Sequence, residues 1–182
     1  MSNDNDLTKS ITLDYENRLK AIFEDFHAHP ELSLAEFETA KKISTALKNH
    51  GFTVTENVGG TGVVALLKNG KGPLVMMRAD MDGLPLEEKT DLPYASKDKQ
   101  LDPVTGNVFP VMHACGHDIH ITALIGTAKQ MVDLKSEWSG TLMLIAQPAE
   151  ERVLGARNMM NDNLWERFGK PDYALAFHVS SM

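Results

Sequence analysis

The feature that most constrains the fold of this chain is a regular alternation between helix-like and strand-like segments. In the helix-like segments apolar residues recur three and four positions apart, whereas the strand-like segments are short apolar runs bounded by turn residues. The expected strands cover 52–55, 62–67, 73–79, 141–146 and 173–177, and the expected helices begin near residues 13, 33, 118 and 155. Elements that alternate in this way pack as layers. The sequence therefore predicts an α/β fold in which helices pack on a largely parallel or mixed sheet.

The first two helices have ends that can be recognised in the sequence. The apolar positions of the first begin at Leu13, and Pro30 ends it because proline cannot continue a helix. Ser33 followed by Glu36 has the spacing of a capping box, which would open the second helix, and Gly51 would close it. Residues 1–12 are expected to form a disordered tail, so that the folded domain would span residues 13–182.

Charge, hydropathy and cysteine content exclude several classes of protein. The formal net charge of −7 argues against nucleic acid as a partner, because phosphate binding needs a basic face. The longest apolar runs, such as Leu142 to Ala146, are much shorter than the roughly 20 residues that a membrane-spanning helix needs. Cys115 is the only cysteine, so an internal disulfide is impossible and a reducing compartment, the cytoplasm, is expected.

Candidate site residues follow three of the expected strands. They are Asp80 and Asp82 after 73–79, Glu150 and Glu151 after 141–146, and His178 after 173–177. Ligands of open α/β sheets bind outside the carboxyl ends of the strands, so these side chains are expected at one edge. The segment 80–112 has no periodicity, and a loop of that length in a compact domain is usually functional.

Cys115 and His117 add a thiol and an imidazole separated only by Gly116, whose freedom lets both side chains face one ion. A thiolate with an imidazole suits zinc, and with carboxylates it can also hold manganese, cobalt or nickel. Glu150 and Glu151 would point in opposite directions if they extended a strand. One could then bind metal while the other handled a proton.

Each of these residues also has an ordinary structural interpretation. A lone cysteine is most often a small buried hydrophobe, adjacent glutamates usually lie on a solvated edge, and His178 can be a hydrogen-bonded histidine at a strand end. His120 would share a helix face with His117, yet it fits a supporting or capping role equally well. Three further histidines have no ligand spacing: His27, His29 and His50. The co-occurrence of the candidates favours a metal centre more than any one of them does.

Several motifs in a fixed order carry a family resemblance. They are HAHPELSLAEFET (27–39), RADMDGLPLEE (78–88), MHACGHDIHITALIGTA (112–128), QPAEE (147–151) and HVSSM (178–182). The chain resembles the M20 metallopeptidase family, and in particular its amidohydrolase branch, which includes hippurate hydrolases, aminoacylases and auxin-conjugate hydrolases.

The resemblance implies a two-metal hydrolase that acts on N-acyl or N-aroyl amino acids. Cys115, His117, Glu151 and His178 would bind two divalent ions, with zinc or manganese favoured and cobalt or nickel also possible. Glu150 would be the general base, and Asp80 would orient or support the metal site. A peptidase, a deacetylase and a non-catalytic metal-binding fragment are the alternatives.

Members of that family are longer than this chain. By that resemblance, residues 13–182 are expected to be an incomplete catalytic domain, without the inserted dimerisation domain or the C-terminal part that supplies a last histidine ligand. Such a chain is expected to have little activity alone. Full-length relatives are expected to be homo-oligomers, and an exposed sheet edge would let this chain self-associate.

Overall fold

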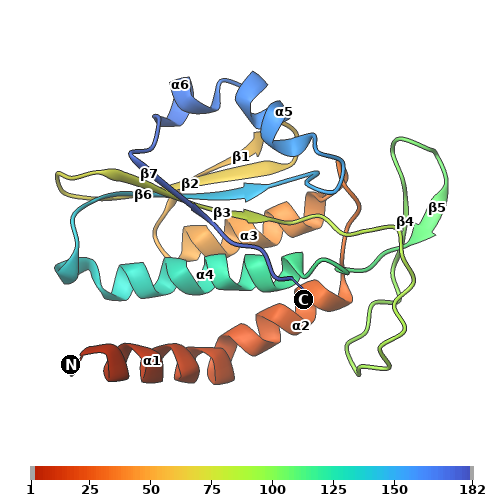
Figure 1. Cartoon of the computed structure of the whole chain (residues 1–182), viewed down its shortest axis with the longest axis horizontal. Coiled ribbons are helices and arrows are strands. Elements are labelled where there is room, and N and C mark those ends of the chain that lie inside the picture. Colours follow the sequence, from red (N-terminus) through yellow and green to blue (C-terminus); the bar gives the residue numbers. More distant parts are fainter. Residues whose placement is uncertain (1–2, 181–182) are drawn as a thin grey trace.

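The computed structural model describes residues 3–180, which form one five-stranded mixed sheet and a separate two-stranded hairpin (Figure 1). The strand order of the main sheet is β1-β2-β6-β3-β7. Its strands are β1 (Thr53–Val58), β2 (Gly62–Asn69), β3 (Leu74–Asp80), β6 (Gly140–Gln147) and β7 (Tyr173–Ala176). β3 is parallel to β6 and β7, whereas β2 is antiparallel to β1 and β6. The predicted α/β fold with helices on a mixed sheet is confirmed.

Helices cover both faces of this sheet (Figure 1). The helices on one side are α1 (Asn3–Asp14), the π-helical turn η1 (Tyr15–Leu19), α2 (Lys20–Ala28), α3 (Phe37–Asn49) and α4 (His117–Asp133). The short 3-10 helix η2 (Lys135–Glu137) leads from α4 into β6. On the other side lie α5 (Gly155–Asn161) and α6 (Leu164–Phe168).

Side chains of the central strands alternate between two apolar layers. In β2, Val63 and Ala65 face the layer under α3 and α4, whereas Val64 faces the layer under α5 and α6. Leu144 and Met143 of β6 divide in the same way. The apolar run of β6 is therefore continuous because both faces of the strand are buried.

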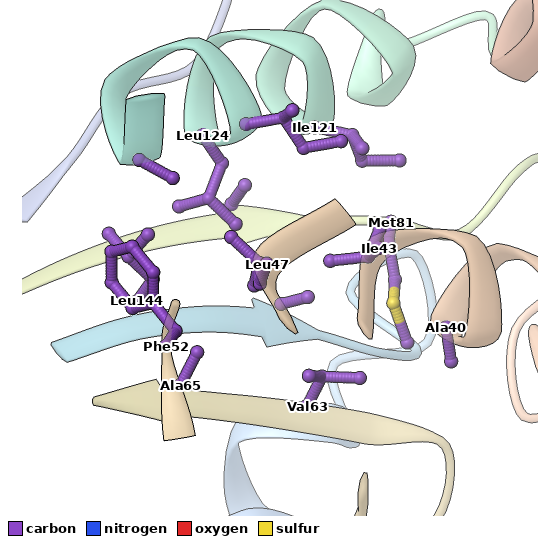
Figure 2. Close-up of a cluster of buried hydrophobic side chains, with 14 of the residues drawn as sticks. Ala40, Ile43, Leu47, Phe52, Val63, Ala65, Met81, Ile121, Leu124 and Leu144 are labelled. Atoms are coloured by element: carbon purple, nitrogen blue, oxygen red, sulfur yellow. The ribbon is translucent and has the colours of Figure 1, made fainter. Parts of the chain in front are cut away.

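The larger apolar cluster fixes α3 and α4 against the sheet (Figure 2). Ile43 and Leu47 of α3 and Leu124 of α4 are fully buried and pack over Leu144 of β6. Burial of such a side chain contributes about 1.5–3 kcal/mol, so several together hold each helix firmly. His117, the first residue of α4, is thereby held at a fixed place relative to the strand ends.

The N-terminal segment differs from the expected disordered tail over 1–12. Residues from Asn3 onward form α1, which continues through η1 into α2, while Met1 and Ser2 lie outside the described residues. Leu7 and Ile11 of α1 line a groove against α4 together with Ala123. They stay 40% and 45% exposed. Such partial burial gives a weak periodic signal, which explains why the sequence pattern did not reveal α1.

The predicted capping box is also wrong. The side chain of Glu36, at the N-cap of α3, makes no capping hydrogen bond, and Ser33 Oγ donates instead to Asp82 Oδ2 at 2.6 Å. Glu31 fills that role, because its carboxylate accepts the amide protons of Glu38 and Thr39 at 3.2 and 2.7 Å. Tertiary partners have taken Ser33 and Glu36 away from the local motif.

The segment that follows β3 is an extended connection, as the sequence predicts, but it contains a hairpin of β4 (Lys99–Leu101) and β5 (Val108–Pro110). β7 forms one edge of the main sheet, and Tyr173 and Leu175 are 64% and 60% exposed there. Self-association through this edge stays a prediction. Between residues 3 and 180 we find no helix with the length and apolar content needed to cross a membrane.

Candidate metal centre

The parallel register brings the ends of three strands to one edge of the sheet. Asp80 pairs with Gln147 between β3 and β6, which places Glu150 and Glu151 just beyond this level. The register of β3 with β7 continues in the same direction, so that His178 follows β7 beside Asp80. The convergence that the sequence predicted is therefore present in the structure.

Gly116 turns the chain into α4 so that His117 enters this edge. Gly116 has a φ of 75°, and a Cβ there would lie 2.5 Å from Val179 Cγ2. Glycine is required on both counts, because side chains disfavour this φ and the approach of Val179 leaves no room. The His117 side chain is fully buried, and its Nδ1 donates to the carbonyl oxygen of Asp82 at 2.8 Å. In the neutral ring, that bond leaves Nε2 as the acceptor.

Two buried polar atoms at this edge face each other without a partner. Neither His117 Nε2 nor Glu151 Oε1 has a hydrogen-bond partner among the described residues, and they lie 3.8 Å apart. Glu150 Oε2 lies 3.7 Å from the same His117 nitrogen, and Asp80 Oδ2 lies 3.6 Å from it. Buried polar groups are almost always partnered, so an unpartnered acceptor beside a carboxylate fits a bound cation.

The possible ligand atoms form two groups that share His117. One contains Cys115, His117 and Glu151, and the other contains Asp80, His117, His120 and His178. Within each group the ligand atoms lie within 4.8 Å of one another. All four residues that the family resemblance implies as metal ligands therefore belong to these groups. A donor set of thiol, imidazole and carboxylate can bind a divalent metal ion.

His120 supports the site through bonds at both ring nitrogens. Its Nε2 accepts the amide proton of Val179 at 3.0 Å, so Nδ1 carries the proton and donates to Asp80 Oδ1 at 2.5 Å. Arg78 also donates to Asp80, at 2.6 Å. Burial opposes ionisation of Asp80, but the His120 bond and the charges of His117 and Arg78 hold its pKa at about 2. These two bonds fit a supporting role for His120.

Glu150 and Glu151 do not extend β6, so the condition under which they were expected to point in opposite directions is not met. β6 ends at Gln147, and Ala149 has a φ of 46°, which turns both glutamates toward His117. Asp82 fixes this turn, because its carboxylate accepts both glutamate amide protons at 3.0 Å. The two carboxylates differ in exposure instead: the side chain of Glu150 is 36% exposed and that of Glu151 is 15% exposed.

The electrostatics of the edge favour a cation. The neighbouring Glu151 carboxylate, burial, and the charges of Glu150 and Asp80 raise the pKa of the Cys115 thiol to about 11. A divalent cation among these groups would reverse the local potential and favour the thiolate, which is the form that binds metal.

His27, which has no ligand spacing in the sequence, connects the long loop to α4. Its Nδ1 lies 2.6 Å from Asp118 Oδ2, and its Nε2 lies 2.9 Å from Glu88 Oε1. Burial disfavours the charged ring, but the hydrogen bonds to Glu88 and Asp118 outweigh it and raise the pKa of His27. Glu88 and Asp118 lie 61 and 91 positions from His27 in the sequence, so no local pattern could reveal these contacts.

We expect the His27 bonds to make stability depend on pH. Because the folded-state pKa lies above the unfolded value of about 6.5, the contribution is complete below that pH and is lost as the pH rises through the folded pKa. His27→Gln should lower the free energy of unfolding by about 3 kcal/mol at pH 6. The difference between variant and parent should shrink above neutral pH, as measured by urea unfolding in the presence of a chelator. A difference that stays constant from pH 6 to 9 would refute this role.

A cleft of about 580 Å³ opens beside the metal groups. Phe23, Ile119 and Val179 give it apolar walls, and Cys115 and His178 lie at its lining. Buried His113 also lines the cleft, although no sequence pattern predicts a role for it. The cleft can hold an apolar group next to the ligand atoms.

Comparisons with known proteins show the family of this chain. The family model of peptidase family M20/M25/M40 matches residues 76–182. The chain is 42% identical over 167 residues to the hippurate hydrolase of Campylobacter jejuni. This alignment covers 91% of this chain and 40% of the relative. The chain is 41% identical over 148 residues to an N-acetylcysteine deacetylase of Bacillus subtilis, covering 80% of this chain and 36% of the relative.

A solved structure of a dinuclear metal binding peptidase of the M20 family from Bacillus subtilis superposes with a TM-score of 0.79. Its sequence is 37% identical to this chain, and the superposition covers 91% of this chain and 44% of that structure. The chain thus spans about two fifths of the length of these relatives.

The α/β fold, with thiol, imidazole and carboxylate groups gathered at one edge of its mixed sheet, is typical of metal-dependent hydrolases. Within that class, the chain belongs to peptidase family M20/M25/M40.

Proposed function

We propose that this chain carries the metal centre of a hydrolase that cleaves the amide bond of N-acyl or N-aroyl amino acids. The observation that carries the proposal is the pair of buried, unpartnered atoms, His117 Nε2 and Glu151 Oε1, 3.8 Å apart. Family membership supports it, and so does the similarity to a protein named hippurate hydrolase.

Cys115, His117, Glu151 and His178 would hold two divalent ions, and their mixed donor set favours zinc or manganese. When bound, the ions would lower the pKa of a water molecule and polarise the acyl carbonyl group. His117 directs Nε2 toward the proposed metal site because its Nδ1 donates to the carbonyl oxygen of Asp82. Asp80 supports the centre through its bond to His120.

Glu150 would transfer the protons. Its carboxylate lies 3.7 Å from His117 Nε2, and its side chain is open to water. It would accept a proton from the attacking water and deliver it to the leaving amine. The more buried Glu151, with its unpartnered oxygen, is better suited to hold metal.

The cleft beside Cys115 and His178 suggests where the acyl group binds. Its apolar walls of Phe23, Ile119 and Val179 fit a hydrocarbon or aromatic acyl group. The single cysteine favours activity in a reducing compartment, and we place it in the cytoplasm.

A deacetylase is the second candidate, because a relative of nearly equal identity is named N-acetylcysteine deacetylase. A peptidase is a third, since the similar structure is titled as one. A metal-binding module without turnover is the non-enzymatic alternative.

A substrate panel separates these functions. We would test a hybrid in which this chain replaces the matched part of the Campylobacter jejuni hippurate hydrolase, because the chain spans 40% of that protein. N-benzoyl and N-acetyl amino acids and a dipeptide would be supplied with zinc or manganese. We expect metal-dependent release of the amino acid from N-benzoyl substrates. Preference for N-acetyl substrates would favour the deacetylase, and metal binding without release would favour the non-catalytic module.

A further inference from the structure

We propose that Glu36 is a positioning residue that holds the Glu150–Glu151 turn in its working conformation. This inference rests on the proposed function. It starts from three consecutive backbone amides, those of Ala149, Glu150 and Glu151, which all donate to buried carboxylates. Asp82 accepts the second and third, and Glu36 Oε1 accepts the first at 2.7 Å.

The environment of Glu36 indicates a dedicated role. The residue is fully buried, and its second oxygen accepts the Thr61 hydroxyl proton at 2.6 Å. Burying a carboxylate is costly unless its hydrogen bonds are made, and here both oxygens are engaged. Glu36 stands at the N-cap of α3 but does not cap it, because Glu31 binds the amides of that helix. The side chain therefore serves the turn and not its own helix.

The backbone conformation of Ala149 explains why the turn needs a hydrogen bond that holds it in place. Its φ of 46° is a left-handed conformation that a residue with a Cβ adopts only when its surroundings impose it. The Glu36 bond fixes the amide at this residue, immediately before the two glutamates. Without the bond, we expect Ala149 to relax and both carboxylates to move relative to His117.

The segment from Ser33 to Glu36 supports the Glu150–Glu151 turn through two hydrogen bonds. Ser33 Oγ donates to Asp82, and Glu36 three residues later reaches Ala149. The segment is anchored because α3 packs through Ile43 and Leu47 into the core. Because α3 is packed in the core, Ser33 and Glu36 hold their hydrogen-bond partners at a fixed position.

Glu36→Ala and Glu31→Ala form a matched pair of variants that separates positioning from folding. Both remove a carboxylate that accepts backbone amide protons, but only Glu36 contacts the turn. The measurements are cobalt affinity of the 182-residue chain, kcat and KM of the hybrid, and the thermal midpoint. Glu36→Ala should weaken cobalt binding and lower kcat by about 10- to 100-fold, with KM changed much less. Glu31→Ala should lower the thermal midpoint without weakening cobalt binding.

Glu36→Gln and Thr61→Val test the positioning role without removing the whole Glu36 side chain. Glu36→Gln retains an oxygen for the Ala149 amide proton and should restore most of the cobalt affinity and kcat that Glu36→Ala loses. If Glu36→Ala does not fold, Thr61→Val removes the hydroxyl donor and should cause a smaller loss in the same direction. Unchanged cobalt affinity and kcat in Glu36→Ala, an equal loss in Glu31→Ala, or no loss in the fallback Thr61→Val would overturn the positioning role alone. An unmodified chain that binds no cobalt would overturn the proposed function as well.

Discussion

Glu150→Gln is expected to lower amide hydrolysis by the hybrid enzyme about 10²- to 10⁴-fold while leaving its metal content unchanged. Glutamine has nearly the shape of glutamate but cannot accept the proton of the attacking water. The backbone amide of Glu150 would still donate to Asp82, so the turn should keep its conformation. The measurement is kcat for an N-benzoyl amino acid, with metal content determined on the same sample.

Glu151→Gln is the matched comparison for this prediction. The two glutamates are adjacent and both amides are held by Asp82, so the variants perturb the turn in the same way. Glu151→Gln should lose metal and activity together, because it alters the oxygen that lies buried and unpartnered. If Glu150→Gln loses metal while Glu151→Gln retains it, the two roles must be exchanged.

His117→Ala is expected to abolish the stabilisation of the chain by metal. A ligand that binds only the folded state stabilises it by about 2.7 kcal/mol at a concentration 100 times its Kd. For a domain of this size that corresponds to a rise in Tm of roughly 5–11 °C. His117 belongs to both groups of possible ligand atoms, so its loss would weaken both groups. Thermal unfolding with and without zinc or manganese measures the effect.

His29→Ala is the control for the loss of an imidazole. His29 is a surface histidine that pairs with Asp98 and belongs to neither group of ligand atoms. Its replacement should leave the metal-dependent rise in Tm unchanged. A full rise in His117→Ala, or equal losses in the two variants, would contradict the central role of His117.

The layered fold and the place of the site could be predicted because they depend on local patterns. The run 141–146 is apolar throughout because β6 is buried on both faces, and its end marks the edge where the acidic residues gather. Once β3, β6 and β7 are parallel, Asp80 and the two glutamates must meet at that edge. Only the direction and register of the strands were needed.

The supporting contacts could not be predicted, because they join residues far apart in the sequence. Ser33 and Glu36 have the spacing of a capping box, yet their partners Asp82 and Ala149 lie 49 and 113 positions away. A local motif was outcompeted by buried tertiary hydrogen bonds. The turn at Ala149 likewise depends on those carboxylates, so the sequence alone could not show that the glutamates do not extend β6.

Cobalt titration of the unmodified 182-residue chain tests whether Cys115 belongs to a metal centre, because a cobalt–thiolate bond produces a strong charge-transfer absorption. We expect this absorption to rise to saturation and to be absent in Cys115→Ser, which removes the only thiol. Glu151→Ala should bind cobalt more weakly. An unmodified chain that binds cobalt without this absorption, or binds none, would contradict a metal centre built on Cys115, His117 and Glu151.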